Sequence, residues 1–378
     1  MKAFFDHQIF LTQRVGGVSR YFYNLKKALV ENELCEVDSW SFIYRNYYLG
    51  KGQGAFYLTP FGIKKLDSLL SSSTSFRYLG AMNNLVALKR YNRNDCDLIH
   101  VTADDSAYIT KSALKKPMVA TVHDLIAERY PSHFPEIKNW LKQRENTFKR
   151  ADHLICISES TKKDLKDIYG INDDKISMIY HGAADYMVKD TMYVSLNDKT
   201  QQPQKYLLYV GDRKTPYKNF WKMVEHLVRF LKEHNQFKLL CVGSSFTPQE
   251  QDKFNHFGIL SAVKSVQAHD CELFSIYENA ACLILPSLYE GFGFPLLEAM
   301  KAGCPVLSSN SSSLPEVGAN GALYFDPVSF ENFTEQLDQI LSNSAVKTGL
   351  LGNQAAVLKK FSWRTTAEQT HNVYKKLV

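Results

Sequence analysis

One stretch in the last third of the chain constrains the fold most: Glu290 to Glu298, which reads EGFGFPLLE. It follows the apolar run Ala281 to Pro286, which is typical of a buried parallel strand, and Pro295 has the fixed φ that suits the first turn of a helix. Gly303 is placed to end that helix. The sequence therefore predicts a strand, a loop and a helix in that order. In open α/β sheets, ligands bind at such a loop, beyond the carboxyl end of the strand.

The residue types in this stretch suit a bound anionic ligand. Gly291 and Gly293 would let the backbone approach a ligand closely, and the following helix would offer unpaired N–H groups to an anion. We expect Glu298 in the first turn of that helix, facing the binding cleft. We expect Glu290 to reach the same space from the loop.

Length and composition limit the class of protein. A chain of 378 residues is too long for one ordinary core and fits two α/β domains. With 45% hydrophobic and 22% charged residues, it has the composition of a soluble globular protein. No run of eighteen apolar residues is present, and the opening MKAFFDHQIF lacks the apolar core of a signal peptide, so we expect a cytoplasmic protein. The seven cysteines lack CxxC spacing, so the sequence supports neither a disulfide framework nor a zinc site.

The longer string EGFGFPLLEAMKAGCPVLSSNSSSLPEV closely resembles the signature of the family 4 retaining glycosyltransferases of the GT-B fold. The resemblance implies an α/β protein with two Rossmann-like domains, whose parallel sheets face each other across a cleft. It also implies transfer of a hexose from a nucleoside diphosphate sugar with retention of configuration. In this family two glutamates eight apart grip the donor, so Glu298 is expected to bind the ribose hydroxyls and Glu290 to face the sugar. The resemblance adds the residues of the loop between them as donor-binding candidates: Gly291, Phe292, Gly293 and Phe294.

Two motifs in the first half of the chain also match the family. The string DHQIFLTQRVGGVSRYF resembles the opening of bacterial surface-polysaccharide members, which makes Gly16 and Gly17, at a predicted helix start, donor-binding candidates. TVHDL, at the end of the predicted strand Met118 to Val122, resembles the family's histidine position near the transferred sugar. His123 is therefore a catalytic-site candidate, expected to contact the sugar rather than to act as a base. Without the resemblance, a lone histidine there is a capping or core residue.

A pair of cations marks the start of the second domain. Arg213 and Lys218 lie in GDRKTPYKN, between the predicted strand Tyr206 to Val210 and an amphipathic helix. Two cations and a helix terminus can together neutralise a diphosphate. The match to the family's arginine and lysine pair makes both residues candidates for donor binding and for stabilising the leaving group without a metal. No DxD motif stands where a metal bridge would be expected, so we expect no metal and no cofactor other than the donor.

The acceptor and the cellular partners are less constrained. The net charge of +6 and the basic residues from Lys111 to Lys166 would suit a nucleic-acid partner, but the sequence contains no motif that binds nucleic acid. A mildly basic face toward anionic lipid on the inner side of the cytoplasmic membrane is one reading, and a solvated helix surface is the other. Residues 40–93, rich in aromatic and basic side chains, are a candidate contact for a saccharide or lipid-linked acceptor, or an ordinary packing insertion.

The predicted domain plan and three rival functions complete the sequence-based hypothesis. We expect an acceptor domain over residues 1–185, a linker over 186–205, a donor domain over 206–362, and a closing helix, 363–378, that packs back onto the first domain. The resemblance implies a nucleoside diphosphate sugar as donor, and we expect GDP-mannose or a UDP-hexose. A glycosidase would also use two carboxylates, but it has no need of the two cations. An epimerase of the same fold would act without an acceptor, and a non-catalytic partner subunit would have no need of the glutamate pair.

Overall fold

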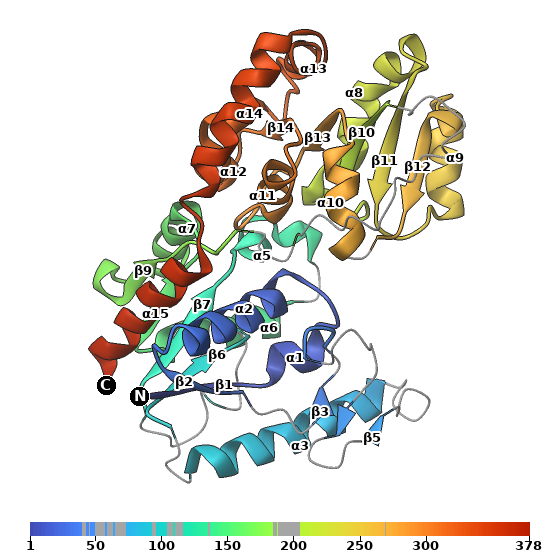
Figure 1. Cartoon of the computed structure of the whole chain (residues 1–378). Coiled ribbons are helices and arrows are strands. Elements are labelled where there is room, and N and C mark those ends of the chain that lie inside the picture. Colours follow the sequence, from blue (N-terminus) through green and yellow to red (C-terminus); the bar gives the residue numbers. More distant parts are fainter. Residues whose placement is uncertain are drawn as a thin grey trace. The chain divides into compact units, whose positions relative to one another are not determined.

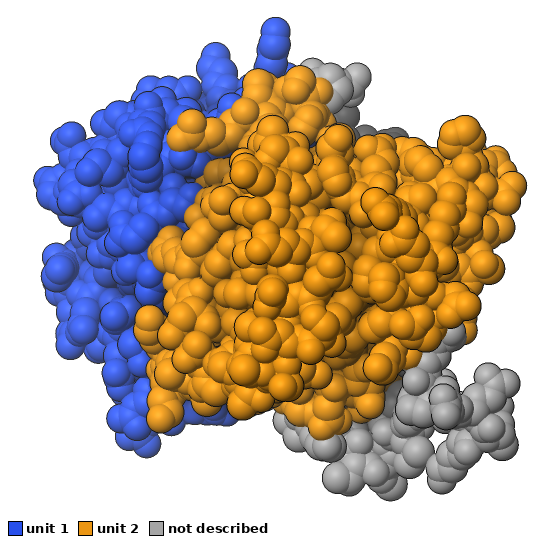
Figure 2. All heavy atoms as spheres, turned by 90° about the horizontal axis from the view of Figure 1, so that it is seen from above, with its two compact units in different colours: residues 1–128, 134–182, 362–378 blue, residues 129–133, 183–361 orange. Residues whose placement is uncertain are grey.

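The computed structural model describes two compact units, which are coloured separately in Figure 2. Each unit contains a six-stranded sheet and helices. The described residues are 1–39, 43–44, 46–49, 57–58, 63–64, 73–92, 96–103, 109, 116–134, 137–183, 187, 205–268 and 270–378. Unit 1 comprises residues 1–128, 134–182 and 362–378, and unit 2 comprises residues 129–133 and 183–361. The expected linker over 186–205 lies outside the described residues except for Met187 and Lys205. The predicted α/β class with two Rossmann-like domains is confirmed.

The sheet of unit 1 is entirely parallel, with strand order β2-β1-β6-β7-β8-β9. Its strands are β1 (Lys2–Phe5), β2 (Glu36–Ser39), β6 (Leu98–Val101), β7 (Met118–Val122), β8 (His153–Cys156) and β9 (Ile176–Met178). The order reverses at β1, beside β6, which is where open α/β sheets leave a crevice for ligands. A separate antiparallel sheet contains β3 (Ile43–Tyr44), β4 (Tyr57–Leu58) and β5 (Ile63–Lys64).

The closing helix belongs to unit 1, although it follows unit 2 in the chain. The described helices of unit 1 and its border are α1 (Gln8–Thr12), α2 (Gly17–Glu31), α3 (Ser73–Asn92), α5 (Ile126–Arg129), α6 (Lys138–Arg150), α7 (Glu159–Tyr169), η2 (Asp173–Lys175) and α15 (Trp363–Leu377). In Figure 1 the red helix α15 runs beside the blue α2, and the two helices are in contact. The backbone approaches closely at Gly182, where a Cβ atom would lie 2.3 Å from Cγ of Trp363.

The sheet of unit 2 has the strand order of a Rossmann fold, β12-β11-β10-β13-β14-β15. Its parallel strands are β10 (Lys205–Val210), β11 (Phe237–Val242), β12 (Val263–Val266), β13 (Cys282–Leu285), β14 (Val306–Ser309) and β15 (Leu323–Phe325). Nearly all of β13 and β14 is buried, as the continuous apolar run CLIL predicts for a central parallel strand. The order reverses between β10 and β13, so the loops that follow these two strands leave the sheet side by side.

Several helices belong to unit 2 together with this sheet. They are η1 (Pro131–His133), η3 (Pro216–Lys218), α8 (Phe220–Glu233), α9 (Pro248–His256), η4 (Leu260–Ala262), α10 (Asp270–Glu278), α11 (Phe294–Lys301), α12 (Leu314–Gly318), η5 (Ala319–Gly321), α13 (Phe333–Ser342) and α14 (Ser344–Leu358). The helical spacing of apolar residues in α8 buries Phe220, Val224, Leu227 and Leu231 in the core of unit 2. No helix in the described part of the chain is long and apolar enough to cross a bilayer.

Candidate active site

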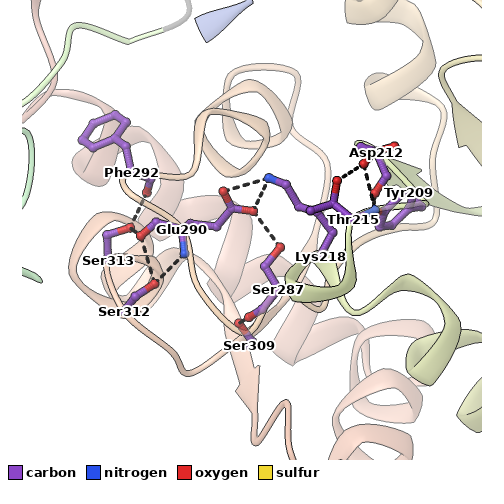
Figure 3. A network of polar contacts seen from close by, with 10 residues as sticks. All are labelled: Tyr209, Asp212, Thr215, Lys218, Ser287, Glu290, Phe292, Ser309, Ser312 and Ser313. Carbon is purple, nitrogen blue, oxygen red and sulfur yellow. Dashed lines mark hydrogen bonds and ion pairs between the residues drawn. The ribbon is translucent and has the colours of Figure 1, made fainter. Parts of the chain in front are cut away.

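Two loops from neighbouring strands meet at the point where the second sheet reverses its order. One loop follows β10 at Gly211, and the other follows β13 at Pro286. A backbone hydrogen bond joins them, from the N–H of Leu288 to the carbonyl of Tyr217 at 2.8 Å. Two motifs that are distant in the sequence therefore lie together at the carboxyl edge of the sheet (Figure 3).

An ion pair between Lys218 and Glu290 forms the centre of this arrangement. The Lys218 ammonium lies 2.7 and 2.9 Å from the two carboxylate oxygens of Glu290. The Ser287 hydroxyl donates to Oε1 of the same carboxylate at 2.6 Å (Figure 3). Glu290 is only 9% exposed, so the lysine and the hydroxyl supply the partners that a nearly buried carboxylate requires. Of the four residues expected to take part in catalysis, the structure thus brings together Lys218 and Glu290, whereas Arg213 contacts other residues and His123 belongs to unit 1.

Local hydrogen bonds shape the loop that carries Lys218. The Asp212 carboxylate accepts hydrogen bonds from the backbone N–H of Thr215 at 2.9 Å and from that of Lys214 at 3.2 Å. The backbone carbonyl of Asp212 accepts a hydrogen bond from the Tyr209 hydroxyl at 2.7 Å. Partial burial alone would raise the pKa of Asp212, but the hydrogen bonds from Thr215 and Lys214 lower it overall. The ionised carboxylate thus holds the tight turn that delivers Lys218 at the end of η3.

Serine hydroxyls hold the backbone of the Glu290 loop. Ser309 donates to the carbonyl of Ser287 at 2.6 Å, and Ser313 lies 2.9 Å from the carbonyl of Glu290. Ser312 interacts twice with Glu290: its hydroxyl accepts the N–H at 2.8 Å and lies 3.0 Å from the carbonyl. Figure 3 shows Ser312 and Ser313 beside the backbone of Glu290, and Ser309 next to Ser287. The run SSNSSS, which begins in the last two residues of β14, therefore fixes the loop before any ligand arrives.

The helix after the loop begins and ends as the sequence predicts. Gly293 is the N-cap of α11 with φ 105°, and a Cβ atom there would lie 2.6 Å from Cδ2 of Leu314, so both backbone and space require glycine. Pro295 lies in the first turn, and the helix ends before Gly303, which is left-handed with φ 67°. Phe292 is buried, with its ring 5.6 Å from that of Phe361, so its side chain packs in the core.

The expected place of Glu298 in the first turn of α11 is wrong. The helix starts at Phe294, so Glu298 lies in its second turn, and the first turn contains no acidic residue. The Glu298 side chain is nearly buried, and its Oε2 accepts a hydrogen bond from the Tyr277 hydroxyl at 2.7 Å. Its predicted role toward a ribose stays a prediction.

Arg213 makes a separate set of contacts and does not join Lys218 in one cluster. Its Nε donates to Oε1 of Glu250 at 2.8 Å, and its Nη2 donates to the carbonyl of Ser244, also at 2.8 Å. The guanidinium carbon lies 4.9 Å from the ring centre of Phe246. Both charged side chains of this pair are nearly buried. Arg213 therefore joins the turn after β10 to the loop after β11, and its diphosphate-binding role stays a prediction.

In unit 1 the glycine pair marks the start of a helix, as predicted. Gly16 is the N-cap of α2, and Gly17 is its first residue. The Gln13 side chain fills the space beside Gly16, where a Cβ atom would lie 2.3 Å from its Cδ. Oε1 of Gln13 accepts the N–H of Ser19 at 2.8 Å. One N–H of the helix start is therefore already satisfied within the protein.

His123 lies at the carboxyl end of β7 inside an aromatic cluster. Its ring is 5.1 Å from the ring of Tyr21, and it stacks on His181 at 5.8 Å. Its Nε2 is buried and has no hydrogen-bond partner among the described residues. Burial, with the nearby Arg144 cation, lowers the pKa of His123 to about 3, so the imidazole is neutral at physiological pH. A neutral imidazole can donate a hydrogen bond to a sugar hydroxyl or accept one from it.

A third buried histidine ties this cluster to the closing helix. Nδ1 of His100 lies 2.6 Å from the hydroxyl of Tyr374 on α15, and Nε2 lies 2.8 Å from the hydroxyl of Thr121 on β7. The Thr121 hydroxyl is in turn 3.3 Å from that of Tyr21. A hydrogen-bonded chain thus runs from α15 through two central strands to α2, next to His123.

Sequence reasoning missed the residues that support these candidates. Glu298 is contacted by Tyr277, Glu290 by Ser287, and Arg213 by Glu250. None of these three supporting residues belongs to a recognised motif. The serine run was noted only as part of a family string. A search for polar residues near the ends of parallel strands would have indicated Ser287, because β13 ends two residues before it.

The comparisons with known proteins agree with this arrangement. Residues 15–184 match the family described as Glycosyltransferase Family 4, and residues 197–355 match Glycosyl transferases group 1. The two matches together span most of the chain, which is therefore a glycosyltransferase. The family recognition made from the sequence is thereby confirmed.

Named relatives of this glycosyltransferase include enzymes of bacterial polysaccharides. It is 26% identical over 271 residues to the O-antigen chain mannosyltransferase B of Escherichia coli, covering 68% of this chain and 70% of the relative. It is also 26% identical over 265 residues to the serotype-specific mannosyltransferase WbdA of Escherichia coli, covering 66% of this chain but only 32% of WbdA. The chain thus spans about a third of WbdA.

Solved structures show the fold of this glycosyltransferase. Anabaena HepE, solved in complex with UDP and glucose, superimposes with a TM-score of 0.70 at 16% sequence identity, over the full length of both chains. The likeness confirms the predicted GT-B fold.

The buried histidines predict acid-sensitive folding of unit 1. Burial, with the nearby His123, lowers the pKa of His100 to about 3, whereas an unfolded histidine binds a proton below about pH 6.5. The unfolded state therefore takes up the proton first, and stability is lost as pH falls from 6.5 toward 3. Between pH 7 and pH 5 one such histidine costs about 2 kcal/mol. Between pH 7 and pH 5 we expect the free energy of unfolding to fall by about 2 kcal/mol less in His100→Gln than in wild type.

Urea unfolding at both pH values, followed by tryptophan fluorescence, measures this difference, because Trp363 lies in unit 1. His256→Gln is the matched control, since His256 is exposed on unit 2 and should leave the pH dependence unchanged. Equal losses in wild type and His100→Gln would show that His100 takes up a proton as readily in the folded protein as in the unfolded chain.

Proposed function

We propose that this glycosyltransferase moves a hexose from a nucleoside diphosphate sugar to a saccharide or lipid-linked acceptor in surface polysaccharide synthesis, with retention of configuration. The observation that carries the proposal is the ion pair of Lys218 and Glu290, held at the carboxyl edge of β10 and β13. An ammonium has three donors, so Lys218 can hold Glu290 and a phosphate oxygen together. Support for a polysaccharide product comes from the relatives named as O-antigen mannosyltransferases.

The chemical demand on this site is stabilisation of the leaving group. When the bond between the sugar carbon and the phosphate oxygen breaks, negative charge grows on the diphosphate. Donors fixed near that oxygen lower the barrier because their interaction is stronger in the transition state than in the ground state. Lys218 is fixed by Glu290, and the loop below it is fixed by serine hydroxyls. We propose that these groups act without a metal or other cofactor.

Arg213 is proposed as the second cation despite its pairing with Glu250. Its Nε and Nη2 are engaged by Glu250 and Ser244. Its Nη1 takes part in neither of these bonds and lies beside Gly243, where an added Cβ atom would make an ordinary van der Waals contact with it at 3.5 Å. In this arrangement Glu250 orients the guanidinium, and Nη1 would reach a phosphate oxygen.

Contact with an anionic membrane stays a prediction of the sequence. Of the basic residues proposed for it, Lys149 pairs with Glu145, Lys163 with Asp167, and Lys162 with Asp173. Pairing of this kind favours the solvated-surface alternative for this part of the chain.

The donor is proposed to be GDP-mannose or a UDP-hexose, and a thermal-shift panel of GDP, UDP and their sugars tests this. A ligand at 100 times its dissociation constant stabilises the folded protein by about 2.7 kcal/mol. We expect one base to stabilise clearly more than the other. Product analysis with the stabilising donor alone and with added acceptor then separates the functions: sugar conversion without an acceptor would indicate an epimerase, and glycoside cleavage without any nucleotide would indicate a glycosidase.

Replacing the two glutamates by alanine is expected to affect two different properties, nucleotide binding and turnover. Glu298→Ala should weaken binding of the free nucleotide, because its carboxylate is proposed to hold the ribose. Glu290→Ala should leave nucleotide affinity near normal and lower turnover, because this carboxylate is proposed to face the sugar. Isothermal titration calorimetry with the nucleotide, together with initial rates, measures both effects. The same loss of affinity in both variants would contradict this division of roles.

The cations should matter more for turnover than for binding. Removing one preorganised donor typically costs on the order of 10²-fold in rate, so Lys218→Ala should lower turnover by about that factor, without rescue by magnesium or manganese. Arg213→Lys should recover only part of the activity of wild type, since an ammonium cannot copy a planar two-pronged donor.

Steady-state rates with and without EDTA measure these effects, and Lys222→Ala on the exposed face of α8 is the matched control. A wild-type enzyme that EDTA silences and manganese restores would contradict the metal-free mechanism. Near-normal turnover of Lys218→Ala would remove this loop from the active site.

A further inference from the structure

A buried tyrosine supports the second glutamate of the site. The Tyr277 hydroxyl donates to Oε2 of Glu298 at 2.7 Å. Tyr277 is fully buried and Glu298 is 6% exposed. Tyr277 lies near the end of α10, which packs against α11, the helix that carries Glu298. The contact therefore joins two helices that precede and follow the central strand β13.

The chemistry of this contact favours a fixed carboxylate. A nearly buried carboxylate needs hydrogen-bond donors, and a bond to an ionised acceptor is roughly twice as strong as one between neutral groups. The tyrosine ring is rigid and packed, so its hydroxyl defines one position for the oxygen it contacts. A carboxylate offers about four lone-pair sites, which allows Glu298 to accept Tyr277 and a ligand hydroxyl together.

We propose that Tyr277 is a positioning residue that aligns Glu298 for the ribose diol of the donor nucleotide. This inference rests on the proposed function, in which Glu298 binds that ribose. It adds a specificity: a carboxylate held by Tyr277 accepts hydrogen bonds from both ribose hydroxyls, so the site discriminates a ribonucleotide from its 2′-deoxy analogue. Without the tyrosine hydroxyl, the carboxylate rotates more freely and the discrimination falls.

The test uses Tyr277→Phe, which keeps the ring and removes only the hydroxyl. The probes are the nucleoside diphosphate, UDP or GDP, that stabilises the wild-type chain more, and its 2′-deoxy form. We expect nucleotide affinity to fall about tenfold and the ribo-to-deoxy affinity ratio to fall toward one. Turnover at saturating donor should change much less than the Michaelis constant, because Tyr277 does not touch the reacting atoms.

The chain offers a closely matched control in Tyr206→Phe. The Tyr206 hydroxyl donates to the carbonyl of Ile276 at 2.7 Å. This bond has the same length as that of Tyr277 and ends on α10, the helix that carries Tyr277, but its acceptor is not a carboxylate. This variant should lose a comparable amount of stability in urea unfolding, yet keep wild-type affinity and the wild-type ribo-to-deoxy ratio.

The outcomes separate the inference from the function beneath it. If Glu298→Ala loses affinity but Tyr277→Phe binds both probes like wild type, the positioning role is wrong and the proposed function stands. If Tyr206→Phe changes the ratio as much as Tyr277→Phe, the effect belongs to helix α10 in general, and the inference is overturned. If Glu298→Ala itself binds normally, the ribose role proposed for Glu298 fails, and the inference fails with it.

Discussion

The ion pair of Lys218 and Glu290 is the contact on which the candidate site depends, because it joins two loops 72 residues apart in the sequence. It forms only because strand order reverses between β10 and β13, which places the two loops next to each other. The serine hydroxyls under the Glu290 loop then hold its backbone. Groups that are already in place need not be ordered when a ligand binds, and preorganised donors are the most effective ones in catalysis.

Local features of the sequence predicted the fold well. Buried strands follow from continuous apolar runs, and the limits of α11 follow from Pro295 and Gly303, because these residues restrict the backbone by themselves. The carboxyl-edge rule for parallel sheets predicted a ligand site at the Glu290 loop, and the family resemblance added Lys218 to it. The family resemblance supplied their proposed roles.

Other parts of the site were not predictable from the sequence. The helix α11 begins at Phe294, so Glu298 is its fifth residue and lies just past the first turn in which it was expected. Arg213, in the loop after β10, is bound by Glu250 on α9, and Tyr277 on α10 reaches Glu298 on the neighbouring α11. Such side-chain contacts follow no period in the sequence, since they depend on which elements the completed sheet brings together.

The packing of α15 has a consequence for the order in which the two units can form during translation. Trp363 and Tyr374 belong to unit 1, yet the ribosome makes them only after all of unit 2. Until then His100 lacks the hydroxyl that its Nδ1 contacts, and α2 lacks the helix that covers it. A nascent chain can therefore complete the fold of unit 2 first, whereas unit 1 is complete only after α15 has been synthesised.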